Sequence, residues 1–390
     1  MIQKILWFRA DAIGDSVLAF SMLPHIKILY PHAKITGLCQ DFLMDVYSES
    51  PYFNTVLSFN KKQFVCDKNY RESFLQQLRD QKFDVVLNSA YSRELSMDSL
   101  ATSIGAREVV GFKVFKRRGR WDFPFRYNQS YSKLIQCANS WISELEKSAI
   151  FLKELGAKGV GELLPLLWVS QEALLFVDAF IKSHAIDHSK IIILCAGALS
   201  DQRKYPLYGK ALADFLYDKE GYTVIALGGK NDCAITQENV KYLSVNYFDL
   251  CGKTSLLEAA AFIQRAALVV GAETGLTHIA CAVGTKNVVL LGGGHFGRFM
   301  PYSPLTTVVS LPLACFGCDW KCPYKKAHCV QDVDYQMISY AMDLALNSNL
   351  SDRSKIILQK KKLSRKKFGE PRWELNERVY DVNNIEIIFW

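Results

Sequence analysis

Short runs of aliphatic and β-branched residues recur throughout the chain, and stretches of helical character separate each run from the next. Most of these runs are apolar on both faces, as strands buried inside a parallel sheet require. The same alternation in both halves predicts two doubly wound α/β domains. The predicted strands are residues 4–8, 35–39, 55–59, 84–88 and 108–112, followed by 191–197, 223–229, 267–273 and 287–293.

The length of 390 residues also favours two hydrophobic cores over one. Glycine and proline cluster at residues 156–167, where we place the hinge. We expect an N-terminal domain at 1–165, a C-terminal domain at 166–346 and a basic appendage at 347–390. Open parallel sheets bind ligands beyond the carboxyl ends of their strands, so the expected ligand site is a cleft between two facing domains.

Composition excludes several classes of protein. Hydrophobic residues make up 49% of the chain and charged residues 22%, which is typical of a globular rather than a disordered protein. There is no apolar run of about 18 residues to span a membrane, and the N-terminus lacks the pattern of a signal peptide. We therefore expect a cytoplasmic protein whose eleven cysteines do not form a disulfide framework.

The formal net charge of +8 is concentrated in two segments. Residues 113–126 hold six Lys or Arg against one Asp, and residues 353–372 hold nine against one Glu. Such patches indicate localised anionic partners, although solvated surface faces are the alternative. Aromatic residues interleave the first patch, which favours binding there; for the second patch both interpretations stay open. The candidate contacts in the first patch are Lys113, Arg117, Arg118 and Arg120.

The first predicted strand is followed by the sequence RADAIGDS at residues 9–16. The segment does not fit G-x-G-x-x-G, so a dinucleotide fingerprint is absent. Gly14 is expected to turn the backbone tightly and leave room for a ligand. Asp15 then lies at a helix N-terminus, where its carboxylate could take a proton from an attacking hydroxyl. A plain helix cap is the alternative.

Two further strand exits carry candidate ligand contacts. Lys204 precedes a helix predicted near Pro206, a position suited to a phosphate-binding cation, although it could equally be a solvated loop lysine. Asp232 follows two glycines at the end of a strand, where a carboxylate often accepts from ribose hydroxyls. A turn or N-cap aspartate is the competing interpretation.

The most informative exit is the segment Glu-Thr-Gly-Leu-Thr-His at residues 273–278. The main-chain N–H groups of Thr274, Gly275 and Leu276 are expected to be unpaired at a helix N-terminus, which would bind a diphosphate. His278 lies one turn further and could reach the same phosphates, although a satisfied core histidine is the commoner case. The next strand ends in Gly-Gly-Gly-His at 292–295, a predicted flexible exit that would bring Gly293 and His295 against the ligand.

Four cysteines fall within fifteen residues in the loop 315–329, with aromatic residues and lysines between them. This density is typical of metal sites, although the spacing is not that of a standard zinc finger. A structural zinc site is the first interpretation and iron the second; a packed cysteine-rich loop or labile disulfides are the alternatives. The candidate ligands are Cys315, Cys318, Cys322 and Cys329.

Taken in order, these motifs resemble glycosyltransferase family 9, the ADP-heptose:lipopolysaccharide heptosyltransferase family. The resemblance covers roughly residues 1–340 and implies a GT-B fold, an inverting reaction and no cofactor for catalysis. The matching segments are residues 9–24, 204–206, 228–232, 254–258, 271–280 and the exit through Pro301.

The resemblance also implies roles for particular residues. Asp15 matches the proposed catalytic base, and Lys204 matches the lysine that contacts the phosphates of the donor. Asp232 stands where the family usually has a glutamate near the nucleoside. Thr274, Gly275 and His278 match the phosphate element D-[ST]-G-x-x-H, in which Glu273 replaces the usual aspartate. The stretch GGGHFGRF also differs from the FGPTDP-like sequence of typical members.

The resemblance therefore implies transfer of a sugar, with heptose from ADP-heptose as the first choice, to a lipopolysaccharide core or related glycan. The close alternative is the same fold with a UDP- or dTDP-hexose donor. A Rossmann oxidoreductase and a nucleic-acid-binding protein with a four-cysteine metal site are more remote, and no nucleic-acid partner is expected. The implied partners are a nucleotide-sugar donor, an anionic glycan or glycolipid acceptor, and the anionic inner membrane as a peripheral contact.

Overall fold

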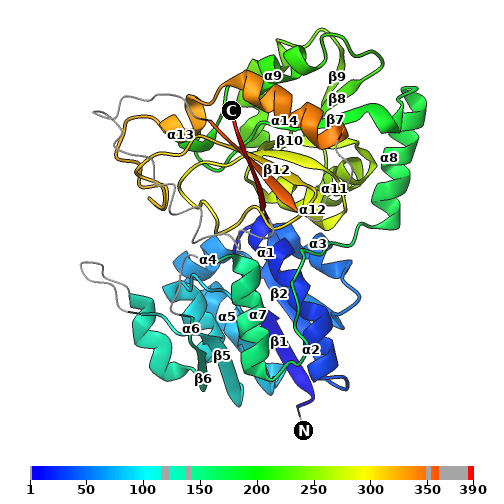
Figure 1. Ribbon diagram of the computed structural model, residues 1–390. Helices are drawn as coiled ribbons and strands as arrows, with labels where there is room; N and C mark the ends of the chain where they lie inside the picture. Colours follow the sequence, from blue (N-terminus) through cyan, green and yellow to red (C-terminus); the bar gives the residue numbers. More distant parts are fainter. Residues whose placement is uncertain (1, 116–122, 138–141, 348–352, 360–384) are drawn as a thin grey trace. The chain divides into compact units, whose positions relative to one another are not determined.

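The computed structural model of the chain describes residues 2–115, 123–137, 142–347, 353–359 and 385–390. Its backbone divides into two compact units (Figure 1). Unit 1 comprises residues 1–140 and 144–168, and unit 2 comprises residues 141–143 and 169–390. No helix within the described residues combines the length and the apolar character that crossing a membrane requires.

Unit 1 is built on a parallel sheet of six strands in the order β3-β2-β1-β4-β5-β6. This is the strand order of a doubly wound Rossmann-like domain, in which the order reverses beside β1. All five strands predicted in this half of the chain are present, and the short edge strand β6 was not predicted. The strands are β1 (Lys4–Phe8), β2 (Lys34–Gln40), β3 (Thr55–Phe59), β4 (Val85–Asn88), β5 (Glu108–Phe112) and β6 (Lys133–Ile135).

Helices connect these strands, and local side chains fix where several of them begin. Asp67 caps the longest helix of the first half, α5, by accepting from the main-chain N–H groups of Asn69 and Tyr70. In Figure 1, α1 and α7 lie beside each other in unit 1. The helices are α1 (Ile13–Ala19), α2 (Leu23–Leu29), α3 (Met44–Ser48), α4 (Lys61–Cys66), α5 (Lys68–Asp80), α6 (Leu95–Ser103) and α7 (Glu144–Leu155).

Unit 2 repeats the same strand order and extends it. Its parallel sheet of eight strands has the order β14-β13-β12-β11-β10-β7-β8-β9, with the reversal beside β7. The four strands predicted in this half are present. The strands are β7 (Ile191–Cys195), β8 (Thr223–Ala226), β9 (Asn246–Asp249), β10 (Leu268–Ala272), β11 (Asn287–Leu290), β12 (Thr306–Ser310), β13 (Ser354–Leu358) and β14 (Ile385–Phe389).

The helices of unit 2 cover this sheet, with α14 packed on β11 and β12 and beside α9 (Figure 1). The segment 254–258, one of the family-like motifs, is a capping box at the start of α11. Ser255 and Glu258 each accept from the main-chain N–H of the other. The helices are α8 (Gln171–Ser183), α9 (Tyr208–Phe215), α10 (Cys233–Val240), α11 (Leu256–Arg265), α12 (Gly275–Ala282), α13 (His328–Gln331) and α14 (Tyr335–Asn347).

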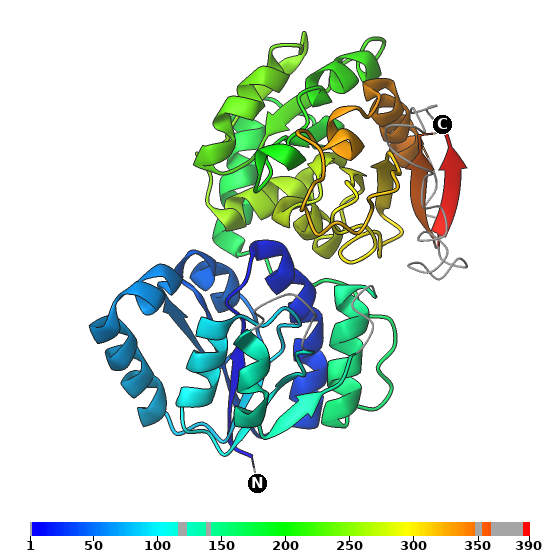
Figure 2. The same cartoon turned by 90° about the vertical axis from the view of Figure 1, so that its left-hand side faces the viewer.

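The C-terminal segment differs from the expectation that residues 347–390 form an appendage. β13 pairs with β12, and β14 pairs with β13, so both strands belong to the sheet of unit 2. Figure 2 shows β14, in red, at the outer edge of that sheet. β13 is fully buried, because its apolar residues Ile356 and Ile357 lie in the core of unit 2. The basic residues around β13 had hidden this apolar pattern.

Candidate functional site

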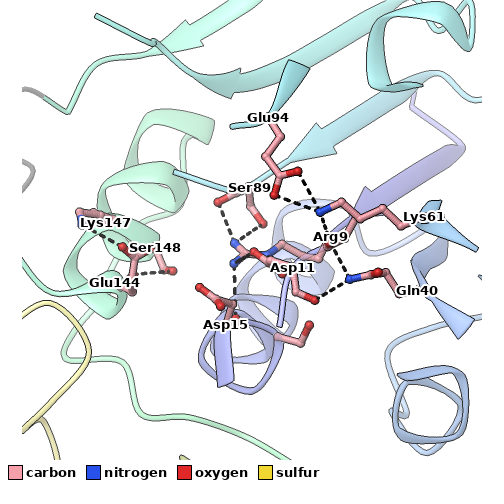
Figure 3. A network of polar contacts seen from close by, with 12 residues as sticks. Arg9, Asp11, Asp15, Gln40, Lys61, Ser89, Glu94, Glu144, Lys147 and Ser148 are labelled. Carbon is pink, nitrogen blue, oxygen red and sulfur yellow. Dashed lines mark hydrogen bonds and ion pairs between the residues drawn. The ribbon is translucent and has the colours of Figure 1, made fainter. Parts of the chain in front are cut away.

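The candidate site of unit 1 is organised by the buried guanidinium of Arg9, which follows β1 (Figure 3). Arg9 binds both carboxylate oxygens of Asp11, at 3.2 and 2.5 Å. Its Nη1 donates to the main-chain oxygen of Ser89 at 2.9 Å, and its Nη2 to that of Asp15 at 3.5 Å. Arg9 therefore ties the turn after β1 to the exit of β4 and to the first turn of α1.

Asp15 is the third residue of α1, so its position agrees with the predicted helix N-terminus. Burial alone would lower the pKa of Arg9, but the carboxylates of Asp11 and Asp15 outweigh burial and raise it. The Asp15 carboxylate therefore lies in the field of a fixed cation. Gly14 is the second residue of the same helix and has no positive φ, so the expected tight turn at Gly14 is not found.

Other polar side chains fix the main chain of this turn. Gln40 donates to the main-chain oxygens of Ala10 and Asp11, and Lys61 donates to that of Ala10 at 3.2 Å while pairing with Glu94. Side chains and main-chain groups at the ends of β1, β2, β3 and β4 form this site, so the order of the strands in the sheet determines it. None of these supporting side chains was predicted from the sequence.

A second buried ion pair lies on α7, in the neighbourhood drawn in Figure 3. Lys147 is 1% exposed, and its ammonium contacts the Glu144 carboxylate at 2.9 Å. The same ammonium lies 4.3 Å from the centroid of the Tyr91 ring.

The basic patch predicted at 113–126 is described only in part: Lys113 follows β5, whereas Arg117, Arg118 and Arg120 lie outside the described residues. Most of the second patch, 353–372, also lies outside them.

The candidate site of unit 2 centres on the carboxylate of Glu273, at the end of β10. Arg203 donates through Nη2 to Glu273 Oε2 at 2.6 Å and also to the main-chain oxygen of Glu273. On the other side, Nε2 of His278 lies 3.2 Å from Glu273 Oε1, and Nδ1 of His278 lies 2.7 Å from the hydroxyl of Tyr302. Both ring nitrogens of His278 are thus engaged inside the protein, as the core-histidine alternative held.

The charge of Glu273 is stabilised although the side chain is buried. Burial alone would raise the pKa of Glu273, but the hydrogen bond with His278 and the charge of Arg203 outweigh it and lower the pKa. Arg203 has a further property that matters for binding. Its Nε and Nη1 groups have no acceptor within the described residues, so a guanidinium held at one edge keeps donors for a ligand.

The N-terminus of α12 corrects one prediction. The main-chain N–H of Thr274 is not unpaired, because it donates to Thr277 Oγ1 at 3.0 Å. The N–H groups of Gly275 and Leu276 have no acceptor within the described residues, and both residues are half-buried. The predicted anion nest therefore comprises two main-chain amides at the end of β10, next to Glu273.

The structure also places the two remaining candidates at strand exits. Lys204 pairs with the exposed Asp201 at 2.7 Å, so it is its neighbour Arg203 that reaches Glu273. Asp232 accepts from the main-chain N–H of Gly229 at 2.9 Å, as the turn interpretation held. Its carboxyl group also lies against the bare face of Gly197 at the end of β7, where any side chain would overlap it.

Aromatic rings occupy the space beside the three glycines 292–294, so the prediction of a flexible exit is corrected. A Cβ on Gly293 would overlap the ring of Phe316, and a Cβ on Gly294 would overlap the indole of Trp320. Glycine is needed here because the loop 315–329 packs directly on the backbone. His295 follows the glycines and contacts Asp319 of that loop at 3.1 Å. Burial and the charge of Arg298 lower the pKa of His295.

The four cysteines predicted as metal ligands all lie in the loop 315–329, and a structural metal there stays a prediction. Within the residues that the structure covers, no group of three or more His, Cys, Asp or Glu side chains is placed to hold a metal ion. Burial raises the pKa of Cys329 to about 12, and the charges of the three other cysteines add to the rise. Cys329 Sγ instead accepts from the Gly293 main-chain N–H. Cys315, Cys318 and Cys322 are half-buried and Cys329 is buried, and none of the four forms a disulfide.

Sequence reasoning missed Arg9, Arg203 and Trp320. Arg9 and Arg203 stand inside motifs that were recognised, but an arginine beside a more familiar aspartate or lysine gave no separate signal. Trp320 could be suspected only from the coincidence of three successive glycines with an aromatic, cysteine-rich loop. Contacts between residues distant in sequence decide all three roles.

Comparison with known proteins agrees with this geometry. The family model described as glycosyltransferase family 9 (heptosyltransferase) matches residues 71–328. The chain is 26% identical over 314 residues to the lipopolysaccharide core heptosyltransferase OpsX of Haemophilus influenzae, covering 79% of this chain and 84% of that protein. It is 24% identical over 323 residues to lipopolysaccharide heptosyltransferase 2 of Escherichia coli, covering 79% and 88%.

Solved structures show the same fold. A family 9 glycosyltransferase from Veillonella parvula superposes with a TM-score of 0.72 at 19% identity, over 88% of this chain and 97% of that one. The E. coli ADP-heptose lipopolysaccharide heptosyltransferase II superposes with a TM-score of 0.66 at 20% identity, over 88% and 98%. The predicted fold class, two doubly wound α/β domains of the GT-B type, is confirmed.

Proposed function

The chain belongs to glycosyltransferase family 9, and we propose that it transfers heptose from ADP-heptose to a lipopolysaccharide core, with inversion at the anomeric carbon. The names of its relatives support the donor and the acceptor class. The observation that carries the proposal is the exit of β7 and β10 in unit 2. There, Glu273 holds Arg203 just before α12 begins at Gly275. Arg203 Nε and Nη1 and the amides of Gly275 and Leu276 have no acceptor within the described residues. Such a set of donors suits a diphosphate.

We assign the diphosphate of the donor to these groups. The guanidinium of Arg203 is fixed by Glu273, so its remaining donors are oriented before the ligand arrives. Lys204 is adjacent in sequence and supplies a second positive charge, once it leaves Asp201. Asp232 holds Gly229 through Oδ2, and its Oδ1 has no donor within the described residues, which leaves it for the ribose hydroxyls.

The proposed reaction is a single displacement. An acceptor oxygen forms a bond to the anomeric carbon while the bond from that carbon to the diphosphate oxygen breaks, and ADP leaves. Asp15 takes the proton of the acceptor hydroxyl. The amides of Gly275 and Leu276, with Arg203, stabilise the negative charge that develops on the leaving diphosphate.

The acceptor is proposed to bind unit 1, where Asp15 lies. Lys113 and the arginines at 117, 118 and 120 supply positive charge for an anionic core glycan. Neutralising these arginines is expected to raise the KM for the acceptor and to leave the KM for the donor unchanged. An equal rise for both substrates would contradict this assignment.

A thermal-shift screen tests the donor class. The protein is incubated with ADP-, UDP-, GDP-, CMP- and dTDP-sugars, and its melting temperature is recorded for each. Ligands that bind the folded state raise the melting temperature by mass action, so ADP-heptose is expected to give the largest rise. A larger rise with a UDP- or dTDP-hexose would assign a different donor to the same fold.

A further inference from the structure

The loop 315–329 is attached to the exit of β11 through main-chain hydrogen bonds. Gly317 donates to the main-chain oxygen of Gly293 at 2.7 Å, and Asp319 donates to that of Gly294 at 3.1 Å. The loop therefore packs directly on the backbone segment that follows β11, a central strand of the sheet. Its rings lie on the glycine backbone because no side chain separates them.

The tip of this loop has an unfavourable local conformation. Asp319 and Trp320 have φ values of 52° and 57°, in the left-handed region that residues with a Cβ rarely adopt. The indole Nε1 of Trp320 is also buried without a hydrogen-bond partner in the described part of the chain. Both features raise the free energy of this conformation of Trp320, so favourable contacts of its side chain must offset that cost.

One of those contacts leads to the proposed diphosphate site. The guanidinium carbon of Arg203 lies 4.8 Å from the centroid of the Trp320 ring, within the range of a cation–π interaction. Glu273 holds one edge of the same guanidinium at 2.6 Å. Arg203 is thus fixed by an aromatic face and by a carboxylate at its edge. The two contacts orient Arg203 Nε and Nη1, which have no acceptor within the described residues.

We propose that Trp320 is a positioning residue of the donor site, which holds Arg203 in the orientation that receives the diphosphate. The loop 315–329 then acts in donor binding through Trp320. This inference rests on the proposed function, because it takes the ligand of Arg203 to be the diphosphate of a nucleotide-sugar. A planar guanidinium suits this arrangement, since it can stack on the indole and still donate in its own plane.

The test measures the dissociation constant of ADP by calorimetry with the full-length protein. Trp320→Ala is expected to weaken ADP binding about tenfold, the loss that corresponds to removing a partly buried cation–π contact. Trp320→Phe keeps an aromatic face and is expected to stay within about threefold of the unchanged protein. Trp390→Ala is the matched control, because Trp390 follows β14 and its ring contacts that of Tyr340, with 5.1 Å between the ring centroids. Melting temperatures establish that each variant folds.

A double-mutant cycle distinguishes positioning from a general structural effect. In an Arg203→Ala background, Trp320→Ala is expected to change ADP affinity less than about twofold, since its partner is already gone. Equal losses in both backgrounds, or unchanged affinity in Trp320→Ala, would overturn the inference and leave the proposed function standing. Failure of the unchanged protein to bind ADP would overturn the proposed donor, and with it this role of Trp320.

Discussion

Two aspartates at the exit of β1 have different surroundings: Asp11 lies in the turn before α1, and Asp15 lies in the first turn of α1. Arg9 binds both carboxylate oxygens of Asp11 but contacts Asp15 through its main-chain oxygen. The two contacts with Arg9 fix the position of the Asp11 carboxylate. The place of Asp15 in the first turn of α1 supports its assignment as the base, and the contact with Arg9 gives Asp11 a supporting role.

Asp15→Asn is therefore expected to lower the rate of transfer by about 10²–10⁴-fold, the usual contribution of a general base. The affinity for ADP is expected to be unchanged, because the proposed diphosphate contacts belong to unit 2. Initial rates and calorimetric titration with ADP check the two parts separately. Asp45→Asn is the control, since Asp45 is an exposed first-turn aspartate of α3. Near-normal transfer by Asp15→Asn would remove this residue from the reaction.

Glu273 gives a pH-dependent prediction at the same scale. Its pKa is lowered in the folded protein, so its pairing with Arg203 and His278 stabilises the fold above the ordinary glutamate pKa. That stabilisation is lost as the pH falls through the lowered value. Glu273→Gln is expected to cost up to about 3 kcal/mol near neutral pH, as for a broken buried pair, and the cost is expected to shrink below about pH 4.

Melting temperatures of both proteins across this pH range provide the measurement. The gap between the curves should be widest above about pH 5 and close progressively in acid. A gap that stays constant, or that widens as the pH falls, would show that the charge of Glu273 does not stabilise the fold.

At the scale of the elements, buried strands were the most predictable part of the structure. Strands such as β7 and β10 are apolar on both faces, and that pattern leaves few alternatives. The edge strand β9 was missed because its side chains are exposed or only half-buried. β13 was missed because basic residues surround it in sequence. β9 lacks the local signal that burial on both faces provides, whereas β12 and β13 are buried and were still not predicted.

The prediction of a flexible segment at Gly292–Gly294, after β11, was wrong for a related reason. Three glycines in a row indicate either mobility or close packing, and only the partner decides between them. Here the partner is the loop 315–329, whose aromatic rings lie on Gly293 and Gly294. The two segments are apart in sequence, so spacing alone could not distinguish the alternatives.

Gly294→Ala is expected to destabilise unit 2 by about 1–3 kcal/mol, because the added Cβ would overlap the indole of Trp320. Chemical denaturation gives the free energy of unfolding. Gly161→Ala serves as the control, since an added Cβ at Gly161 meets no atom within 4 Å and its φ is not positive. Equal stability of the two variants would mean that the loop does not pack on the exit of β11.

At the scale of the whole molecule, the repetition of one strand order in both units explains why the fold class could be predicted. Each unit reverses its strand order beside its first strand, and the candidate residues stand at the exits of β1, β7, β8 and β10. The sequence could therefore place Asp15, Lys204, Asp232 and Glu273 at ligand-binding edges. It could not predict that Arg203 rather than Lys204 contacts Glu273. Both residues are basic neighbours in one loop, and only the backbone conformation decides which side chain points toward Glu273.

The central claim is that this chain is a family 9 enzyme that moves heptose from ADP-heptose to a lipopolysaccharide core. The most direct measurement is mass spectrometry of a heptose-deficient core acceptor after incubation with ADP-heptose and the full-length protein, with Asp15→Asn run beside it. The predicted result is an acceptor heavier by one heptose residue, an equal amount of released ADP, and little product with the variant. An acceptor that gains nothing from ADP-heptose but gains a hexose from a UDP- or dTDP-hexose would contradict the account.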